Sequence, residues 1–293
     1  MQMTIADAIY AQLLAQILSE GDEVVTRNSE TFSHINLPNV TFDSFPLVTL
    51  RKTQWSKAVR EMEWFFSGNA KCPSELLNWW NGQLNENNYL LDGYGVQLRE
   101  FTSFPINDYP PHSFDQIYFI LNALRTNPNS RRLLMTVWNP GEMAVITETN
   151  DNPNTPTCCH SIVVQFFVRD GALHMKTYQR SADMLLGVPH NWVQSWAMLV
   201  YFAHHANLKV GTMTWIWGDA HIYNEESHLQ AANELIGAAQ VAYAEPPLTS
   251  LDLQYTFNAT APNNDVIPEF RTNEFTLIGE IPKPTVLTKP KLL

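Results

Sequence analysis

Apolar residues recur at a spacing of three or four in several stretches of the chain, which predicts amphipathic helices. The predicted helices cover residues 4–19, 53–67, 114–126 and 191–206. The last stretch is apolar almost all round, so we expect that helix to lie at the centre of the molecule.

Short alternating or compact apolar runs predict strands between these helices. Two of them flank Arg27 and predict a hairpin-like pair. An Arg-Asp-Gly turn joins strands predicted at 161–168 and 172–178. Further strands are predicted at 45–50, just after Arg132, and over 210–223.

Polar segments complete the pattern. Residues 148–157 are rich in Asn, Pro and Thr and predict a surface loop. From about residue 258 the chain is rich in Pro and polar residues, and from about 280 we expect an extended C-terminal tail. The pattern predicts one domain over residues 1–293, of class α+β, with a large mixed β-sheet and helices packed on it.

Composition narrows the choice of partners. Hydrophobic residues make up 45% of the chain and charged residues 16%, with nine Trp and fifteen Phe, which favours extensive buried surface, including a subunit interface. The net charge of −11 argues against direct nucleic-acid binding, which needs a basic surface. A phosphate group would therefore need a local cluster of arginines.

The three cysteines, Cys72, Cys158 and Cys159, indicate no disulfide framework and favour a reducing, cytoplasmic environment. The N-terminus lacks the basic region and cleavage site of a signal peptide. No apolar run reaches the roughly 18 residues that would cross a membrane, so no membrane partner is expected.

Cys159 is the strongest candidate nucleophile, because it follows a Pro-Thr loop at the start of a strand and has His160 beside it. A hydrolase that uses this Cys-His pair is one interpretation. Neighbouring residues on a strand point to opposite faces, however, which places His160 poorly as the base for Cys159.

Arginines at loop and strand ends form a candidate phosphate clamp, since each offers paired donors. They are Arg27, Arg131, Arg132 and Arg180. His204-His205 and the pair His221 and His228 lack the spacing and third ligand of a zinc site, so no metal is expected.

Several motifs resemble the thymidylate synthase family over nearly the whole chain. They read FPLVT, SRR, C-H…QF, YQRSADMLLGVP.N and GDAHIY, in the family's order and rough spacing. The resemblance implies a homodimer with the sheet face at its interface. In this homodimer each site would borrow Arg131 and Arg132 from the partner. The resemblance also implies 5,10-methylenetetrahydrofolate as co-substrate, dUMP as the nucleotide and no metal.

The resemblance also implies a role for each matching residue. Cys159 would add to C6 of the pyrimidine, Glu61 would relay protons, and Tyr94 would assist removal of the C5 proton. The remaining roles are phosphate binding by Arg27, Arg180 and Ser181, base and ribose binding by Gln179, Asn191, His221 and Tyr223, and folate binding by Trp80, Asp183 and the tail. The amide of Asn191 both donates and accepts, which suits the N3–H/O4 edge of uracil and favours dUMP over dCMP.

Some positions depart from the usual synthase pattern. Glu63 and His190 stand where synthases carry apolar residues, Trp217 replaces a glycine, and Glu280 replaces a tyrosine. One extra residue between Cys159 and Gln165 predicts a bulge. The phage-type hydroxymethylases of the family carry a similar Glu-x-Glu-Trp sequence and add water where synthases add hydride.

Glu63 and His190 are therefore candidates to activate water, and they favour a deoxyuridylate hydroxymethylase that makes 5-hydroxymethyl-dUMP, with the cytoplasm of a phage host as its setting. The alternative is a thymidylate synthase that makes dTMP and dihydrofolate, which the retained Trp80 supports. A dCMP hydroxymethylase, a Cys-dependent hydrolase and an inactive nucleotide-binding homologue are further readings.

Overall fold

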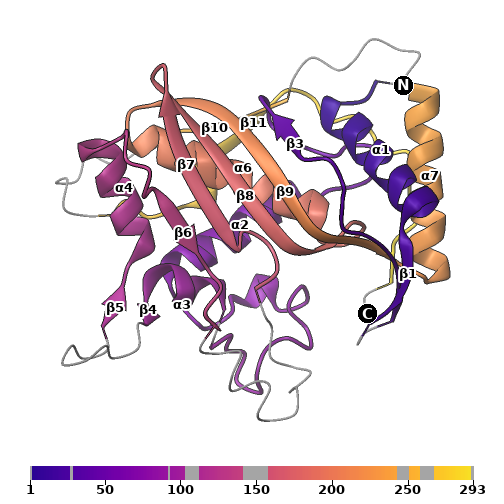
Figure 1. Ribbon diagram of the computed structural model, residues 1–293, viewed down its shortest axis with the longest axis horizontal. Coiled ribbons are helices and arrows are strands. Elements are labelled where there is room, and N and C mark those ends of the chain that lie inside the picture. The colour runs from indigo at the N-terminus through magenta and orange to yellow at the C-terminus, as the bar shows by residue number, and fades with distance from the viewer. Residues whose placement is uncertain are drawn as a thin grey trace.

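The computed structural model describes residues 2–26, 29–91, 93–102, 112–140, 158–242, 251–257 and 267–291, and its fold is α+β (Figure 1). Its main sheet contains β1 (Asp22–Val25), β2 (Glu30–His34), β3 (Val40–Phe42), β6 (Leu134–Thr136), β7 (Val163–Arg169), β8 (Ala172–Asp183) and β9 (Lys209–Tyr223). The strand order is β1-β2-β9-β8-β7-β6, with β3 also paired to β9. Only β8 and β9 run parallel, so the sheet is mixed, as expected.

The other elements are helices and short strands. The helices are α1 (Ile5–Glu20), α2 (Trp55–Ser67), α3 (Tyr94–Arg99), α4 (Gln116–Thr126), α6 (Val188–His205) and α7 (Glu226–Ala242), with 3-10 turns η1 (Ser74–Leu76) and η2 (Thr272–Glu274). Two hairpins pair β4 (Phe101–Thr102) with β5 (Ser113–Phe114) and β10 (Asp252–Tyr255) with β11 (Phe275–Ile278).

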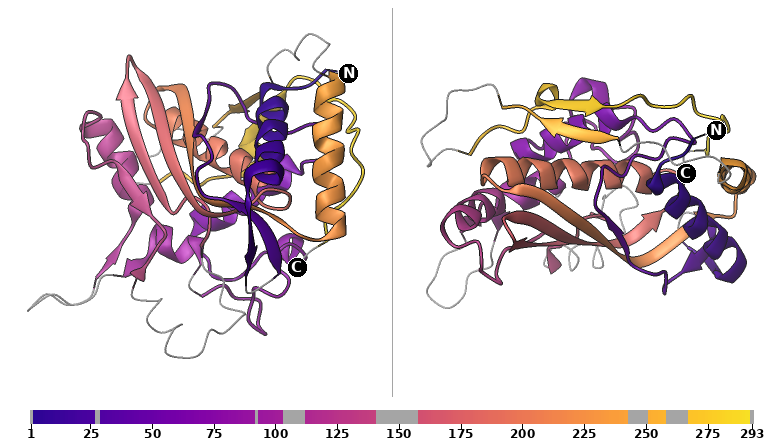
Figure 2. Two further views of the ribbon diagram at one scale, coloured as in Figure 1. Left: turned by 45° about the vertical axis from the view of Figure 1, so that its right-hand side comes forward. Right: turned by 90° about the horizontal axis from the view of Figure 1, so that it is seen from above.

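The prediction of a central helix is confirmed. α6 lies between the main sheet and the β10–β11 hairpin, and α2 packs beside it (Figure 2). All but three of its residues are buried, and Trp192, Tyr201 and Phe202 are completely so. At the other end of the molecule α1 and α7 lie side by side (Figure 1). Burial of this many aromatic side chains makes α6 the platform on which the neighbouring elements are fixed.

The prediction of a strand over residues 45–50 is wrong. This segment is buried, but the Asp7 carboxylate takes the place of a strand partner. Oδ1 accepts hydrogen bonds from the backbone N–H of Thr49 at 2.7 Å and of Leu50 at 3.0 Å, and Oδ2 accepts from the Thr49 hydroxyl at 2.7 Å. Asp7 also closes a capping box with Thr4 at the start of α1.

The sequence patterns did not indicate α3, α7 or the β10–β11 hairpin. The predicted 148–157 loop lies outside the described residues. The C-terminal tail is extended, as predicted, and follows residue 50 and then α7: the Leu50 carbonyl accepts from the N–H of Val286 at 2.9 Å, and the Lys291 carbonyl lies 2.8 Å from His228 Nε2. Within the described part of the chain, no helix is long and apolar enough to cross a membrane.

Candidate active site

Cys159 lies just before β7, beside the end of β8. Its carbonyl accepts a hydrogen bond from the Arg180 N–H at 2.9 Å, and Ile162 N–H then bonds the Tyr178 carbonyl at 3.0 Å. Between these two bonds Ser161 adopts a positive φ of 50°, which a residue with a side chain seldom does. This kink lies in the segment where the sequence predicts a bulge, and it sets the Cys159 side chain apart from the regular ladder.

The Tyr94 hydroxyl holds the backbone at the nucleophile. It accepts hydrogen bonds from the N–H of Cys159 at 2.9 Å and of His160 at 3.3 Å, and it lies 3.5 Å from Cys159 Sγ. Burial raises the pKa of Tyr94 well above its ordinary value, so the hydroxyl keeps its proton. Because the two N–H groups occupy the lone pairs of the Tyr94 oxygen, the hydroxyl proton is left to donate to the Cys159 sulfur.

The Cys159 thiol is free, and opposing effects set its pKa. Burial raises the pKa, while the Tyr94 hydroxyl and the Arg180 guanidinium counteract that rise. The net shift is upward, so the thiol form dominates before a ligand arrives. Because only the thiolate is a strong nucleophile, the Tyr94 hydroxyl and the Arg180 guanidinium are the two neighbours that favour its formation here.

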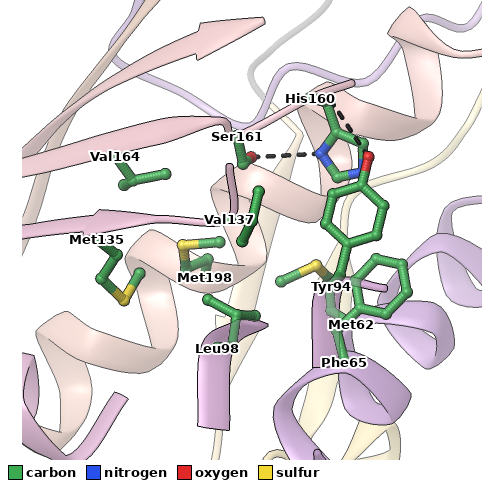
Figure 3. A pocket seen from close by; sticks show the side chains of 10 residues that line it. All are labelled: Met62, Phe65, Tyr94, Leu98, Met135, Val137, His160, Ser161, Val164 and Met198. Atoms are coloured by element: carbon green, nitrogen blue, oxygen red, sulfur yellow. Dashed lines mark hydrogen bonds between the residues drawn. The ribbon is translucent and has the colours of Figure 1, made fainter. Parts of the chain in front are cut away.

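His160 does not serve Cys159 as a base. Its ring stacks on Tyr94, with centroids 4.6 Å apart, and its Nδ1 lies 3.3 Å from the Ser161 hydroxyl (Figure 3). Burial lowers its pKa to about 3, so the imidazole is neutral. The cavity that it lines holds only about 10 Å³, too little for a substrate. This geometry removes the basis for the hydrolase reading.

A chain of buried polar side chains runs from α2 to β8. The Glu61 carboxylate accepts hydrogen bonds from Trp80 Nε1 and from Gln194 Nε2. The Gln194 Oε1 accepts from Asn191 Nδ2 at 3.0 Å, and Asn191 Oδ1 accepts from Gln179 Nε2 at 3.2 Å. Burial raises the pKa of Glu61 to about 7, which suits a group that exchanges protons near neutrality.

Gln194 is the member of this chain that sequence reasoning missed. It is completely buried on α6, three residues after Asn191, in a stretch that otherwise reads as apolar. The only signal that could have found it is an uncharged amide at a position facing the core, since such a group needs partners when it is buried.

The two parallel strands bring further candidates together. Ser181 pairs with Asp219 and Asp183 with His221, which places the ends of β8 and β9 side by side. The Arg180 guanidinium lies 5.2 Å from the centre of the Trp138 ring. Its Nε is buried without a hydrogen-bond partner among the described residues, as is His221 Nδ1. Such groups suit an incoming phosphate or hydroxyl.

Tyr223 lies two residues beyond His221 on β9, and the two rings are 5.2 Å apart. Trp80 packs against Tyr94, with ring centroids 6.4 Å apart, and is therefore part of the same wall as the nucleophile. Asp183 Oδ1 accepts from the N–H groups of Leu185 and Leu186, both at 2.9 Å, so this carboxylate is held in place at the turn before α6.

Both candidates for water activation are engaged elsewhere. Glu63 turns toward η2: its Oε2 accepts from the Thr272 N–H at 2.8 Å and hydroxyl at 2.6 Å, and it pairs with Arg60. His190 Nδ1 lies 3.0 Å from the Leu186 carbonyl, and its Nε2 accepts from the Gln54 N–H at 3.4 Å. Burial lowers the pKa of His190 to about 4.

The arginines of the predicted phosphate clamp come from separate parts of the chain. Arg131 and Arg132 are exposed in the turn before β6, and Arg27 lies outside the described residues. Trp217 is buried beside Trp192 and Trp215, and its Nε1 donates to the Pro38 carbonyl at 3.0 Å, so it is a core residue. Glu280 is exposed. No group of three or more potential ligands that could hold a metal occurs in the part of the chain that the structure covers.

Comparison with known proteins identifies the family. The family model described as thymidylate synthase matches residues 8–290. A thymidylate synthase from Corynebacterium aurimucosum is 33% identical over 290 residues, which cover 97% of each chain. The chain therefore belongs to the thymidylate synthase family. It is a folate-dependent one-carbon transferase that acts on dUMP, with methylenetetrahydrofolate as co-substrate.

Proposed function

We propose that this protein is a thymidylate synthase, which converts dUMP and methylenetetrahydrofolate to dTMP and dihydrofolate. The observation that carries this proposal is the hydrogen-bond network from Trp80 through Glu61 and Gln194 to Asn191. Trp80 also packs against Tyr94, whose hydroxyl contacts Cys159. The network supplies a group that reads uracil, a carboxyl that exchanges protons and a large apolar ring in one buried place.

The reaction would begin at Cys159. Its thiolate adds to C6 of the pyrimidine, which makes C5 nucleophilic enough to take the one-carbon unit. Glu61 exchanges protons with O4 through water, and the Tyr94 hydroxyl, 3.5 Å from the sulfur, lies where it would assist loss of the C5 proton. The folate co-substrate supplies the one-carbon unit and, in the synthase reaction, the hydride that completes the methyl group.

We place the phosphate at Arg180 and Ser181 together with Arg27, the ribose at His221 and Tyr223, and the folate along Trp80 and Asp183. Two buried atoms support the first two assignments: Arg180 Nε, which has no hydrogen-bond partner in the described ranges, and His221 Nδ1, which has none either and lies 3.8 Å from Asp219 Oδ1. The half-buried Asp183, fixed by two backbone N–H groups, supports the third.

We further propose a homodimer through the sheet face opposite α6. On that face the side chains of Val163, Gln165 and Phe167 alternate with buried ones along β7 and are themselves only partly exposed. The exposed Arg131 and Arg132 would then reach the phosphate of the partner's site. A single chain leaves both guanidinium groups in solvent, which is consistent with a partner completing the clamp.

Hydroxymethylation of dUMP is the second candidate, and His190 is the observation that supports it. This imidazole is half-buried next to Asn191, and its ring lies 5.0 Å from that of Trp79. We prefer the synthase because Glu63 is held by Thr272 and Arg60, and both nitrogens of His190 already have partners.

The nucleotide product decides between the two. After incubation with dUMP and methylenetetrahydrofolate, a product of the mass of dTMP with one equivalent of dihydrofolate would support the synthase. A product bearing a hydroxymethyl group, without dihydrofolate, would support the hydroxymethylase and make His190 the next residue to substitute.

A further inference from the structure

Gln194 stands between the charge at Glu61 and the amide that reads the base. It is completely buried, its Nε2 donates to Glu61 Oε2, and its Oε1 accepts from Asn191 Nδ2 at 3.0 Å. No other side chain in the described structure bonds both Glu61 and Asn191.

When Glu61 is ionised, its carboxylate fixes the direction of each hydrogen bond in this network, and both of its oxygens accept, from Trp80 and from Gln194. An ionised carboxylate only accepts, so Gln194 must turn its NH2 group toward Glu61 and its oxygen toward Asn191. That oxygen in turn requires the NH2 group of Asn191. Gln179 Nε2, which donates to Asn191 Oδ1 at 3.2 Å, requires the same orientation.

The orientation leaves Asn191 with one remaining N–H and one remaining lone pair. Uracil offers a carbonyl oxygen at C4 and an N–H at N3, which match them. Cytosine offers an amino group and a bare nitrogen, the reverse pattern, so Asn191 would have to turn over. Gln194 would then turn as well and direct its oxygen at the Glu61 carboxylate, where two acceptors repel.

We propose that Gln194 is a positioning residue for base specificity: it transmits the acceptor character of Glu61 to Asn191 and so sets the site to read uracil rather than cytosine. The inference rests on the proposed function, because it requires a pyrimidine nucleotide at Asn191. It explains why a long amide is buried in an otherwise apolar stretch of α6.

The test is calorimetric binding of dUMP and of dCMP to the full chain. Gln194→Met keeps the length of the side chain but neither donates nor accepts, so we expect the dUMP-to-dCMP affinity ratio to fall about tenfold. Glu61→Gln, whose amide both donates and accepts, should lower the ratio as well while keeping a buried polar group. The matched control is Gln116→Met, which removes another buried amide. Gln116 bonds the backbone of Gln97 and Thr136 and is not part of the network of Glu61, Gln194 and Asn191.

A lower dUMP-to-dCMP affinity ratio in both variants, with an unchanged ratio in the Gln116→Met control, would support the inference. An unchanged ratio in Gln194→Met or in Glu61→Gln would overturn it, and circular dichroism would verify that each variant is folded. The proposed function fails in a different way: the unsubstituted protein would form no dTMP and dihydrofolate from dUMP, whatever the affinity ratio of the variants.

Discussion

At the scale of single residues, the site depends on what burial does to a few titratable groups. Glu61 and His160 are buried and Cys159 is partly buried, and in each case burial disfavours the charged form. Sequence motifs nominated Cys159, Glu61, Tyr94 and Asn191 for the proposed site. They could not identify Gln194, because nothing in a run of residues reveals which buried positions face a carboxylate on another helix.

Glu61 gives a pH-dependent stability that can be measured. Its pKa rises from 4.5 when unfolded to about 7 when folded, so the folded state binds the proton more tightly. Below pH 4.5 Glu61 is protonated in both states, so its titration does not change the free energy of unfolding. Between pH 4.5 and 7 stability falls as pH rises, by up to about 3 kcal/mol.

Glu61→Gln removes this titration. We expect the variant to gain stability relative to the unsubstituted protein as pH increases from 5 to 8, as measured by urea unfolding at each pH. A difference between the two proteins that stays constant across this range would contradict the assignment of a raised pKa to Glu61.

At the scale of elements, the strong periodic patterns were reliable guides, and the failures have physical causes. The central helix followed from an apolar run. Residues 45–50 are also an apolar run but form no strand, because Asp7, 42 and 43 residues away, accepts from the N–H groups of Thr49 and Leu50. α7 is rich in alanine and has a weak apolar stripe, so its pattern did not distinguish it from a loop.

Glu63 connects two such elements, α2 and η2. Glu63→Ala removes two hydrogen bonds from Thr272 and the ion pair with Arg60, so we expect a loss of about 2 kcal/mol in unfolding free energy with the same nucleotide product. Glu75→Ala is the control, since Glu75 also pairs with Arg60 but is exposed. A change of product in Glu63→Ala would revive its role in activating water.

At the scale of the whole molecule, the proposed dimer predicts complementation between inactive partners. Cys159→Ser lacks the nucleophile, and the double variant Arg131→Ala and Arg132→Ala lacks the borrowed guanidinium groups. In a mixed dimer one site has both, so unfolding and refolding an equal mixture should restore about a quarter of full activity. Each variant refolded alone serves as the control, and a mixture no more active than these would contradict shared sites.

The central claim is that Cys159 attacks C6 of dUMP, and an intact-protein mass spectrum tests it most directly. With fluorine in place of the C5 hydrogen, the proton that must leave is missing, so the adduct should accumulate. After incubation with 5-fluoro-dUMP and methylenetetrahydrofolate, we expect the protein mass to increase by the sum of both ligands, with the label on the peptide containing Cys159 and none on Cys159→Ser. A protein that gains no mass, or that carries the label on Cys72 or Cys158, would contradict the account.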